Sequence, residues 1–336
     1  LNVALFGLDS REGDLGKGNR SDTMMIASLN KATGEVKLVS VYRDTLLELD
    51  DGSYNKANAA YAFGGPEGAI SMINRSMDMD ISKYVAVNFN ALFDVIDALG
   101  GLDITLTDAE VVHMNNYCVE TSKVTGADYT KIEPEVAGTY HLNGVQAVSY
   151  SRIRYTGGGD FERTSRQRHV LELIAEKAQS ASFSTLNKII DKVFPQVSTN
   201  FTIAEMIAYA KDIAKYKLGD SMGFPDNNSF DMLDVVGSVV IPETLTSNVE
   251  DVHKFLFGDD GYTISSNITD MEAGIREKCT HKATSDSVIE SDDYGSGSGT
   301  SNDYSNSGSS NSNYNNSYNN NYNNSYNNSG SSGGTG

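Results

Sequence analysis

The chain has 336 residues, with 26 Lys and Arg against 45 Asp and Glu, and its net charge at pH 7 is −19. Such an acidic protein is a poor candidate for sequence-independent binding of nucleic acid, which needs a basic surface. The sequence contains no apolar run long enough to span a bilayer. Its two cysteines, Cys118 and Cys279, are too few for a disulfide scaffold and lack metal-ligand spacing, and the sequence leaves open whether they pair.

The segment 285–336 differs in composition from the rest of the chain. It consists mainly of Ser, Asn, Gly and Tyr, and it lacks Leu, Phe, Met, Lys and Arg. A segment of this kind cannot bury enough apolar surface to offset the entropy lost on ordering, so we expect it to be disordered. Residues 1–284 are then the folded domain, which is long enough to build a full hydrophobic core.

Three strand-like segments open the chain, and the second and third are joined by the short connection KATG. We expect these strands at residues 2–9, 22–30 and 35–44. A hairpin between the second and third strands would bring Asp22 and Arg43 to the same edge of the sheet. Asp9 would reach that edge if the first strand pairs beside them.

The remaining segments alternate between helical and extended patterns. We expect helices at residues 65–77, 90–101, 161–180, 184–194 and 202–216, a strand at 102–106, a helical turn running into a strand over 144–155, and a last strand that ends the core near 242. Residues 110–138 are polar and are expected to be an irregular loop. This mixed order predicts a three-layer α/β/α sandwich with a mixed central sheet.

Residues 150–170, YSRIRYTGGGDFERTSRQRHV, contain half of the ten arginines of this acidic chain. On the expected strand, Arg152 and Arg154 would project from one face. Arg163 would lie at the start of the following helix, and such a helix N-terminus itself attracts anions. Because arginine binds phosphate oxygens through two parallel hydrogen bonds, the cluster indicates a phosphate site.

The helix beyond these residues is harder to interpret. Arg166 and Gln167 follow Arg163 by about one turn and could join the phosphate site. For Arg166 and Arg168 alone, a solvated helix face with carboxylate partners is the simpler interpretation. We include Arg166 because of its neighbours and leave out Arg168 as a surface residue.

Two carboxylates near these arginines, Asp9 and Asp22, suit a Mg²⁺ or Mn²⁺ ion that keeps several waters and bridges phosphates. Lys56 lies in NKANAAYAFGG, just before a helix, where an ordinary capped loop is the simpler interpretation. Motifs of the P-loop, nucleophile-elbow, zinc-protease and paired-cysteine types are absent from the sequence.

Seven motifs, in this order, resemble the LytR-CpsA-Psr family of cell-envelope phosphotransferases. They are GLDSR (7–11), RSDTMM (20–25), SVYRD (40–44), KANAAYAFGGPEGA (56–69), ALGGLDI (98–104), HLNGVQAVSYSRIRY (141–155) and GDFERTSRQR (159–168). Two positions depart from the family pattern: Tyr42 stands where Pro is usual, and Glu162 where Gly is commoner.

The resemblance implies an enzyme outside the cell, anchored to the membrane by a segment preceding Leu1. It would transfer a glycopolymer, such as wall teichoic acid or capsular polysaccharide, from a polyprenyl-pyrophosphate carrier to peptidoglycan. The prenyl chain would lie in an apolar tunnel between sheet and helices. Nucleic acid is not an expected partner.

The resemblance also implies roles for individual residues. Asp9 and Asp22 would hold Mg²⁺ or Mn²⁺. The pyrophosphate would be bound by Arg20, Arg43, Arg152, Arg154, Arg163, Arg166 and Gln167, with Arg11 and Lys56 as further contributors. The chemical step would depend on Arg43, Arg152, Arg154 and Asp160. Asp160 is a candidate for the group that accepts the hydroxyl proton, as is a metal-bound carboxylate. For Asp160, an acid near a helix N-terminus is the simpler interpretation.

Two other functions remain open at this point. The same site could hydrolyse lipid-linked or nucleotide pyrophosphates with water as the acceptor. Alternatively, the protein could be a non-catalytic cell-wall scaffold whose Tyr/Asn-rich tail makes the contacts.

Overall fold

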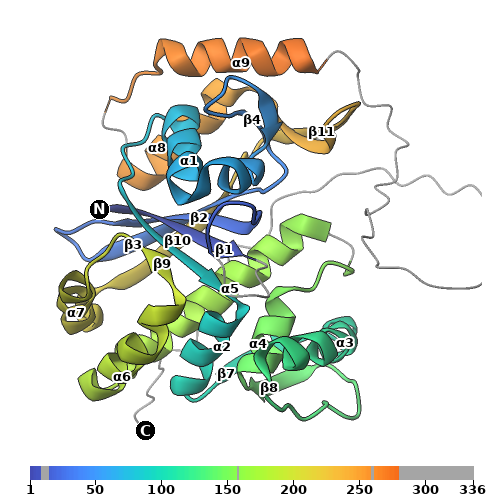
Figure 1. The fold of residues 1–336 in the computed structure, drawn as a ribbon, viewed down its shortest axis with the longest axis vertical. Helices are drawn as coiled ribbons and strands as arrows, with labels where there is room; N and C mark the ends of the chain where they lie inside the picture. The colour runs from blue at the N-terminus through green and yellow to red at the C-terminus, as the bar shows by residue number, and fades with distance from the viewer. Residues whose placement is uncertain (9–14, 157–158, 259–260, 280–336) are drawn as a thin grey trace, which may run out of the picture. The chain divides into compact units, whose positions relative to one another are not determined.

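A mixed six-stranded sheet lies at the centre of the fold (Figure 1). The structure is a computed structural model and describes residues 1–8, 15–156, 159–258 and 261–279. The sheet has the order β10-β3-β2-β1-β6-β9. Its strands are β1 (Asn2–Leu8), β2 (Ser21–Leu29), β3 (Glu35–Val41), β6 (Lys83–Asn88), β9 (Ser198–Thr199) and β10 (Lys217–Phe224). The expected tail, residues 285–336, lies outside the described residues.

Helices cover both faces of this sheet, so the expected three-layer sandwich is confirmed (Figure 1). One layer contains α1 (Ala59–Met77), α8 (Leu245–Phe257) and α9 (Ser266–Lys278). The other contains α2 (Phe89–Ala98), α3 (Asp108–Thr125), α4 (Gly144–Ser151), α5 (Gly159–Ser180), α6 (Phe183–Val193) and α7 (Ile203–Lys211), with short 3-10 turns at Phe194–Gln196 and Ile213–Lys215.

Three small hairpins complete the described fold. They are β4 (Leu46–Glu48) with β5 (Tyr54–Lys56), β7 (Leu102–Leu106) with β8 (Gly138–Leu142), and β11 (Asn228–Leu233) with β12 (Gly237–Pro242). The expected strand at 102–106 is therefore present, but it belongs to a hairpin separate from the central sheet.

The layer of α1, α8 and α9 closes one face of the sheet with a continuous hydrophobic core. Ala4, Phe6 and Leu8 alternate along β1 and join this core, in the period-two pattern of a strand. The helices contribute fully buried side chains such as Ile73 and Val249. A second core lies among α2, α3, α4 and the β7–β8 hairpin.

The directions of the first three strands agree with the sequence-based expectation. β1, β2 and β3 pair antiparallel in chain order, with Leu8 opposite Ser21 and Met24 opposite Val41. The start of β2 and the residues after β3 therefore meet at one edge, where they bring Asp22 and Arg43 together. Asp9 would follow directly after β1, but it lies outside the described residues.

The expected strand at Arg152 and Arg154 is wrong. Helix α4 continues to Ser151, and Arg152 caps its C-terminus. The helix begins with a capping box, in which the Asn143 side chain accepts from the backbone N–H of Gln146 and the Gln146 side chain accepts from that of Asn143. Arg152 and Arg154 therefore lie at and just after the C-terminal end of a helix, and they do not project from one face of a strand.

The expected irregular loop at 110–138 is also wrong over its first half, which forms α3. Thr107 and Glu110 make a capping box at its start. Its buried face includes the polar residues Asn115 and Thr121, which explains why hydrophobic periodicity did not reveal it. Asn115 is paired with the backbone of Ile132, so it can be buried at low cost.

The core does not end near residue 242. Helices α8 and α9 follow and add Leu245, Val252 and Met271 to the core on the α1 side. Strands β6 and β10, which both pair within the central sheet, were not predicted from the sequence. The open question of the cysteines is answered, because both thiols are free: Cys118 is buried in α3 and Cys279 follows α9.

Candidate active site

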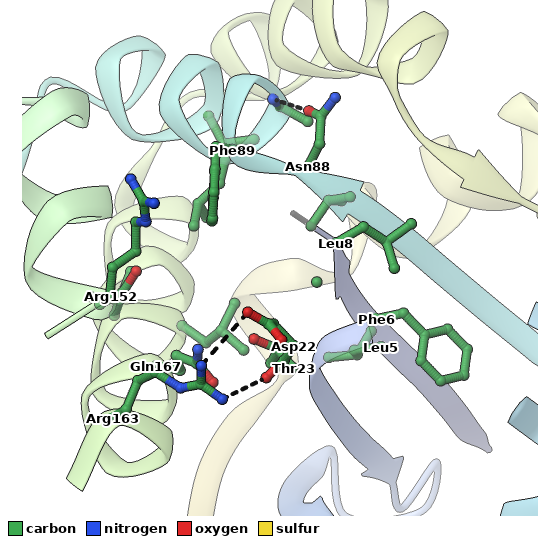
Figure 2. A pocket seen from close by; sticks show the side chains of 18 of the residues that line it. Leu5, Phe6, Leu8, Asp22, Thr23, Asn88, Phe89, Arg152, Arg163 and Gln167 are labelled. Atoms are coloured by element: carbon green, nitrogen blue, oxygen red, sulfur yellow. Dashed lines mark hydrogen bonds and ion pairs between the residues drawn. The ribbon is translucent and has the colours of Figure 1, made fainter. Parts of the chain in front are cut away.

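A largely apolar cavity of about 380 Å³ lies between the sheet and the helices on the side of α2 and α5 (Figure 2). Strands β1, β2 and β6 form its floor, and α2 and α5 form its walls. Its apolar lining includes Leu5, Val87, Leu92, Val95, Leu171 and Ile174. Gly7 also lines the cavity. A Cβ atom at this position would lie 2.9 Å from Thr23 Cβ, which is too close, so the floor has room only for glycine here.

One end of this cavity is charged. Asp22 lies there at the start of β2, and Arg154, Arg163 and Gln167 line the same region. Figure 2 shows the Arg163 side chain directed from α5 toward Asp22. An apolar volume with ionic groups at one end has the chemical character of a site for an amphiphile with an anionic headgroup.

Asp22 is the centre of this charged cluster. Its carboxylate accepts a hydrogen bond from Arg43 Nη1 at 2.8 Å and one from Arg154 Nη2 at 3.1 Å. Arg163 Nη1 lies 3.6 Å from the same carboxylate, while Arg163 Nη2 donates to the backbone carbonyl of Asp22 at 3.0 Å. The structure therefore brings Asp22, Arg43, Arg154 and Arg163 together, as the sequence predicts.

The charges of this cluster determine its protonation. Burial opposes ionisation of Asp22, but the guanidinium groups of Arg163, Arg43 and Arg154 outweigh that effect and hold the pKa of Asp22 below its usual range. Burial lowers the pKa of Arg163 to about 10, which still leaves it charged at neutral pH. Arg43 is more exposed than Arg163 and has three carboxylate neighbours, which raise its pKa despite burial.

Two further carboxylates, those of Asp160 and Asp44, extend the cluster beyond the residues that line the cavity. Asp160, near the start of α5, has Oδ1 2.7 Å from Arg163 Nη2 and 3.4 Å from Arg43 Nε. Asp44 bridges Arg43 Nε at 3.3 Å and Lys56 Nζ at 3.3 Å. Asp44 thus holds Lys56 at the edge of the cluster. This role of Asp44 was not predicted, although Asp44 directly follows Arg43 in the sequence.

Arg152 lines the cavity but takes no part in the Asp22 cluster. Its guanidinium donates to Glu120 at 2.9 Å and to Thr121 at 3.1 Å. It also lies over the rings of Phe89 and Tyr117, at 4.5 and 5.4 Å from their centroids, and Figure 2 shows it beside Phe89. The partners from α3, Tyr117, Glu120 and Thr121, were not predicted because that segment was expected to be irregular.

Arg166 is not brought to the cavity. It is buried in a closed network, with Nε 2.8 Å from Glu110 and Nη2 2.9 Å from Glu162, and Nη1 donates to the carbonyl of Ile153 at 3.2 Å. This saturated pairing links α3, α5 and the segment after α4. Glu162, which the sequence comparison with the family pattern singled out as a departure, is one of its carboxylates.

The other predicted residues have varied positions. Arg20 is exposed, directly before β2. Asp9 and Arg11 lie outside the described residues. Arg168 is not the surface residue expected from the sequence: it is half-buried beside Tyr42, and its Nη1 has no hydrogen-bond partner in the described part of the chain.

Two polar atoms at the charged end of the cavity also lack partners. Within the described residues, Arg163 Nε and Gln167 Oε1 are buried and make no hydrogen bond. Leaving a buried polar group unpaired costs about 1–3 kcal/mol. Both residues line the cavity, so a polar ligand at this end would relieve that cost.

Neither a closed metal site nor a membrane span is found in the described ranges. No group of three or more His, Cys, Asp and Glu side chains there is arranged to hold a metal ion. None of the helices described is both long and apolar enough to cross a bilayer.

Several curated proteins with one shared name, polyisoprenyl-teichoic acid–peptidoglycan teichoic acid transferase TagU, are similar to this chain. The protein from Bacillus cereus (strain AH820) is 33% identical over 217 residues, which cover 63% of this chain and 64% of the relative. The protein from Enterococcus faecalis (strain ATCC 700802 / V583) is 33% identical over 215 residues, covering 63% of this chain and 65% of the relative. The chain therefore spans slightly less than two thirds of the length of these relatives.

A solved structure supports the same fold. YwtF (TagT) of Bacillus subtilis, with bound octaprenyl pyrophosphate lipid, has a TM-score of 0.56 at 22% identity, covering 78% of this chain and 90% of that chain. The model of one family, described as the LytR_cpsA_psr family, matches residues 1–232, and this range is more than half of the sequence. The chain belongs to the LytR_cpsA_psr family.

Proposed function

We propose that this protein transfers a glycopolymer, such as wall teichoic acid or capsular polysaccharide, from a polyprenyl-pyrophosphate carrier to peptidoglycan, forming a phosphodiester. The observation that carries the proposal is the apolar cavity with Asp22, Arg154 and Arg163 at one end. The names of the TagU relatives and the lipid bound in the TagT structure support it.

The cavity is proposed to hold the prenyl chain. Away from the charged end its lining is apolar and includes Leu5 and Ile174. Each methylene group of a lipid that is buried contributes about 0.8 kcal/mol to the free energy of binding. The carbon skeleton of the prenyl chain would thus fill a space that the side chains of the protein leave open. Arg152, fixed by Glu120 and two aromatic rings, borders this space.

The pyrophosphate is proposed to lie at the charged end, against Arg43, Arg154 and Arg163. Arg154 is the most accessible of the three, with 38% of its side chain exposed, so it can turn from Asp22 to a phosphate oxygen. The unpaired Nε of Arg163 offers another donor. Phosphoryl transfer depends mainly on positioning and charge neutralisation, which such arginines supply.

We also infer a Mg²⁺ or Mn²⁺ ion bound at Asp22, with Asp9 as a second ligand. The residues fit such an ion, because Asp22 is ionised and lines the cavity, and Mg²⁺ needs only one or two carboxylates beside water and phosphate oxygens. The carboxylates of Asp22, Asp44 and Asp160 already neutralise most of the arginine charge. When bound, the ion supplies further positive charge to the pyrophosphate.

The described residues suggest how the reaction proceeds. A sugar hydroxyl of the acceptor attacks the phosphorus that carries the polymer. The new P–O bond forms as the bond to the bridging oxygen breaks, and polyprenyl phosphate leaves with the bonding electrons. Arg43 and Arg163 stabilise the charge that develops, and we propose that Asp160, which contacts both, accepts the hydroxyl proton. Because its acceptor is peptidoglycan, the enzyme would work on the outer side of the membrane.

A labelled polyprenyl-pyrophosphate glycan, supplied with and without peptidoglycan, tests the proposal. Transfer predicts label bound covalently to peptidoglycan, together with polyprenyl monophosphate, only when the acceptor is present. Release of phosphate at the same rate without acceptor would instead identify a hydrolase. A protein that does neither, yet still binds cell walls, would be a scaffold.

A further inference from the structure

Three aromatic side chains form a column at the outer edge of the charged cluster. The rings of Tyr42 and Phe161 meet edge to face with centroids 4.4 Å apart. Phe161 in turn meets Phe230 of β11 edge to face at 5.6 Å. Tyr42 directly precedes Arg43, and Phe161 directly follows Asp160, so the column borders the Arg43–Asp160 ion pair.

The column ends in an apolar surface on the β11–β12 hairpin. Phe230 is 40% exposed, and Met232, on the same face of β11, is 61% exposed. Val235, in the loop of the hairpin, is 97% exposed. A group of exposed apolar side chains beside a polar site is typical of a binding surface rather than of an ordinary monomer surface.

This surface and the cavity adjoin the ionic cluster through different residues. None of the three aromatic residues lines the cavity, and neither does Arg43 or Asp160. From the cavity, the chain of contacts runs through Asp22 and Arg163 to Asp160 and then to the aromatic column. The apolar cavity and the aromatic surface thus adjoin different residues of the ionic cluster.

Phosphoryl transfer places the attacking and leaving oxygens roughly in line. If the prenyl chain occupies the cavity, the leaving oxygen points toward the cavity and the attacking hydroxyl approaches from the other side. The residues that border the cluster without lining the cavity include Asp160, Phe161 and Phe230. A pyranose ring has an apolar face of C–H groups that matches a flat aromatic ring.

We propose that Phe161 and Phe230 form the acceptor subsite, against which the sugar ring carrying the attacking hydroxyl lies. This inference rests on the proposed function, because it uses the cavity as the site of the leaving group. Tyr42 packs edge to face against Phe161 and so helps to hold its ring. Its hydroxyl occupies the space over Gly223, where any side chain would clash with it.

The charges of the hairpin argue for a sugar rather than a membrane as the partner. The sequence from 219 to 253 contains no Lys or Arg, whereas the exposed Asp226 and Asp234 flank the apolar side chains. Segments that lie on anionic membranes usually carry basic residues. A neutral or weakly charged glycan imposes no such requirement.

The test uses the full chain, a labelled lipid donor and soluble, uncrosslinked glycan strands from peptidoglycan as acceptor. In F230A the KM for the glycan strands should rise roughly five- to tenfold, the size of a lost aromatic contact. The KM for the lipid donor should stay unchanged. F230W should restore the acceptor KM, while F230L, which keeps apolar bulk without a flat ring, should behave like F230A.

Phe257 provides the matched control. It is 42% exposed and also contacts one aromatic ring, that of His253 at 5.5 Å, but it lies at the end of α8. F257A should leave the acceptor KM unchanged. The subsite is refuted if F230A matches the wild type, or if F257A raises the acceptor KM equally.

Two further measurements separate the alternatives. Loss of binding to phosphatidylglycerol–phosphatidylcholine vesicles in F230A, with an unchanged acceptor KM, would show a membrane contact and overturn the inference. If the wild type transfers nothing, the proposed function fails, and binding of the glycan strands alone decides the subsite. Weaker glycan binding by F230A would still support it, and equal binding would exclude it.

Discussion

The two faces of the central sheet differ in how completely they are filled. On the side of α1, α8 and α9, side chains such as Ile73 and Val249 are fully buried in a continuous core. On the side of α2 and α5, Val87 and Leu171 are only half-buried and line the cavity. Protein interiors are normally close-packed. The difference therefore indicates that one face stabilises the fold, while the other keeps apolar space for a ligand.

The charged end of the open face should be the most sensitive to change. Asp22→Asn leaves three arginines around an uncharged amide, and it also removes a proposed metal ligand. We expect transfer to fall by roughly 10²- to 10³-fold, as for the loss of one preorganised electrostatic group. Initial rates of label transfer to peptidoglycan measure this effect. Asp191→Asn, an exposed change on α6, is the control and should keep full activity.

A pair of truncations compares the stability of the two faces directly. Ile73→Ala removes a fully buried side chain from the filled face and should lower the free energy of unfolding by about 2–5 kcal/mol. Leu171→Ala removes a side chain that already borders empty space and should cost about 1 kcal/mol. Urea denaturation of both variants gives the two values. Equal losses would contradict the contrast between the faces.

Filling the open face should affect substrate choice more than stability. Val87→Phe places a ring in the cavity, so an octaprenyl donor should bind at least about tenfold more weakly, which corresponds to 1.4 kcal/mol. A short prenyl donor should lose less. Measuring the KM of both donors checks this. A uniform loss for both chain lengths would indicate damage to the charged end instead.

The smallest expected effect is the pH dependence of the Asp22 cluster. Because its folded-state pKa is lowered, Asp22 stabilises the fold at pH values above its unfolded pKa of about 4, and this contribution is lost as the pH falls through the lower folded value. Asp22→Asn should therefore be less stable than the wild type at pH 7, with the gap closing below about pH 4. Urea midpoints across this range measure it, and a gap independent of pH would contradict the ion pairing.

The sequence predicted the parts of the site that depend on strand direction and local spacing. Asp22 and Arg43 meet because the KATG hairpin defines which strand ends adjoin, and Arg163 reaches them because it opens α5. The roles assigned to these residues in binding pyrophosphate and metal stay predictions.

Partners contributed by distant segments could not be predicted. Arg166 pairs with Glu110, and Arg152 pairs with Glu120. Both glutamates belong to α3, a helix whose buried face is partly polar. Local patterns contain no information about which carboxylate of a distant segment a given arginine meets. The cavity itself also depends on tertiary packing, because its lining comes from strands and helices far apart in the chain.

The central claim is that one ligand occupies both the apolar cavity and its arginine end. Calorimetric titration with farnesyl pyrophosphate, octaprenyl pyrophosphate and the corresponding uncharged octaprenol tests it most directly. The account predicts affinity that rises with chain length and falls sharply when the pyrophosphate is missing. Equal affinity for the short and long pyrophosphates, or unchanged binding of the alcohol, would contradict it.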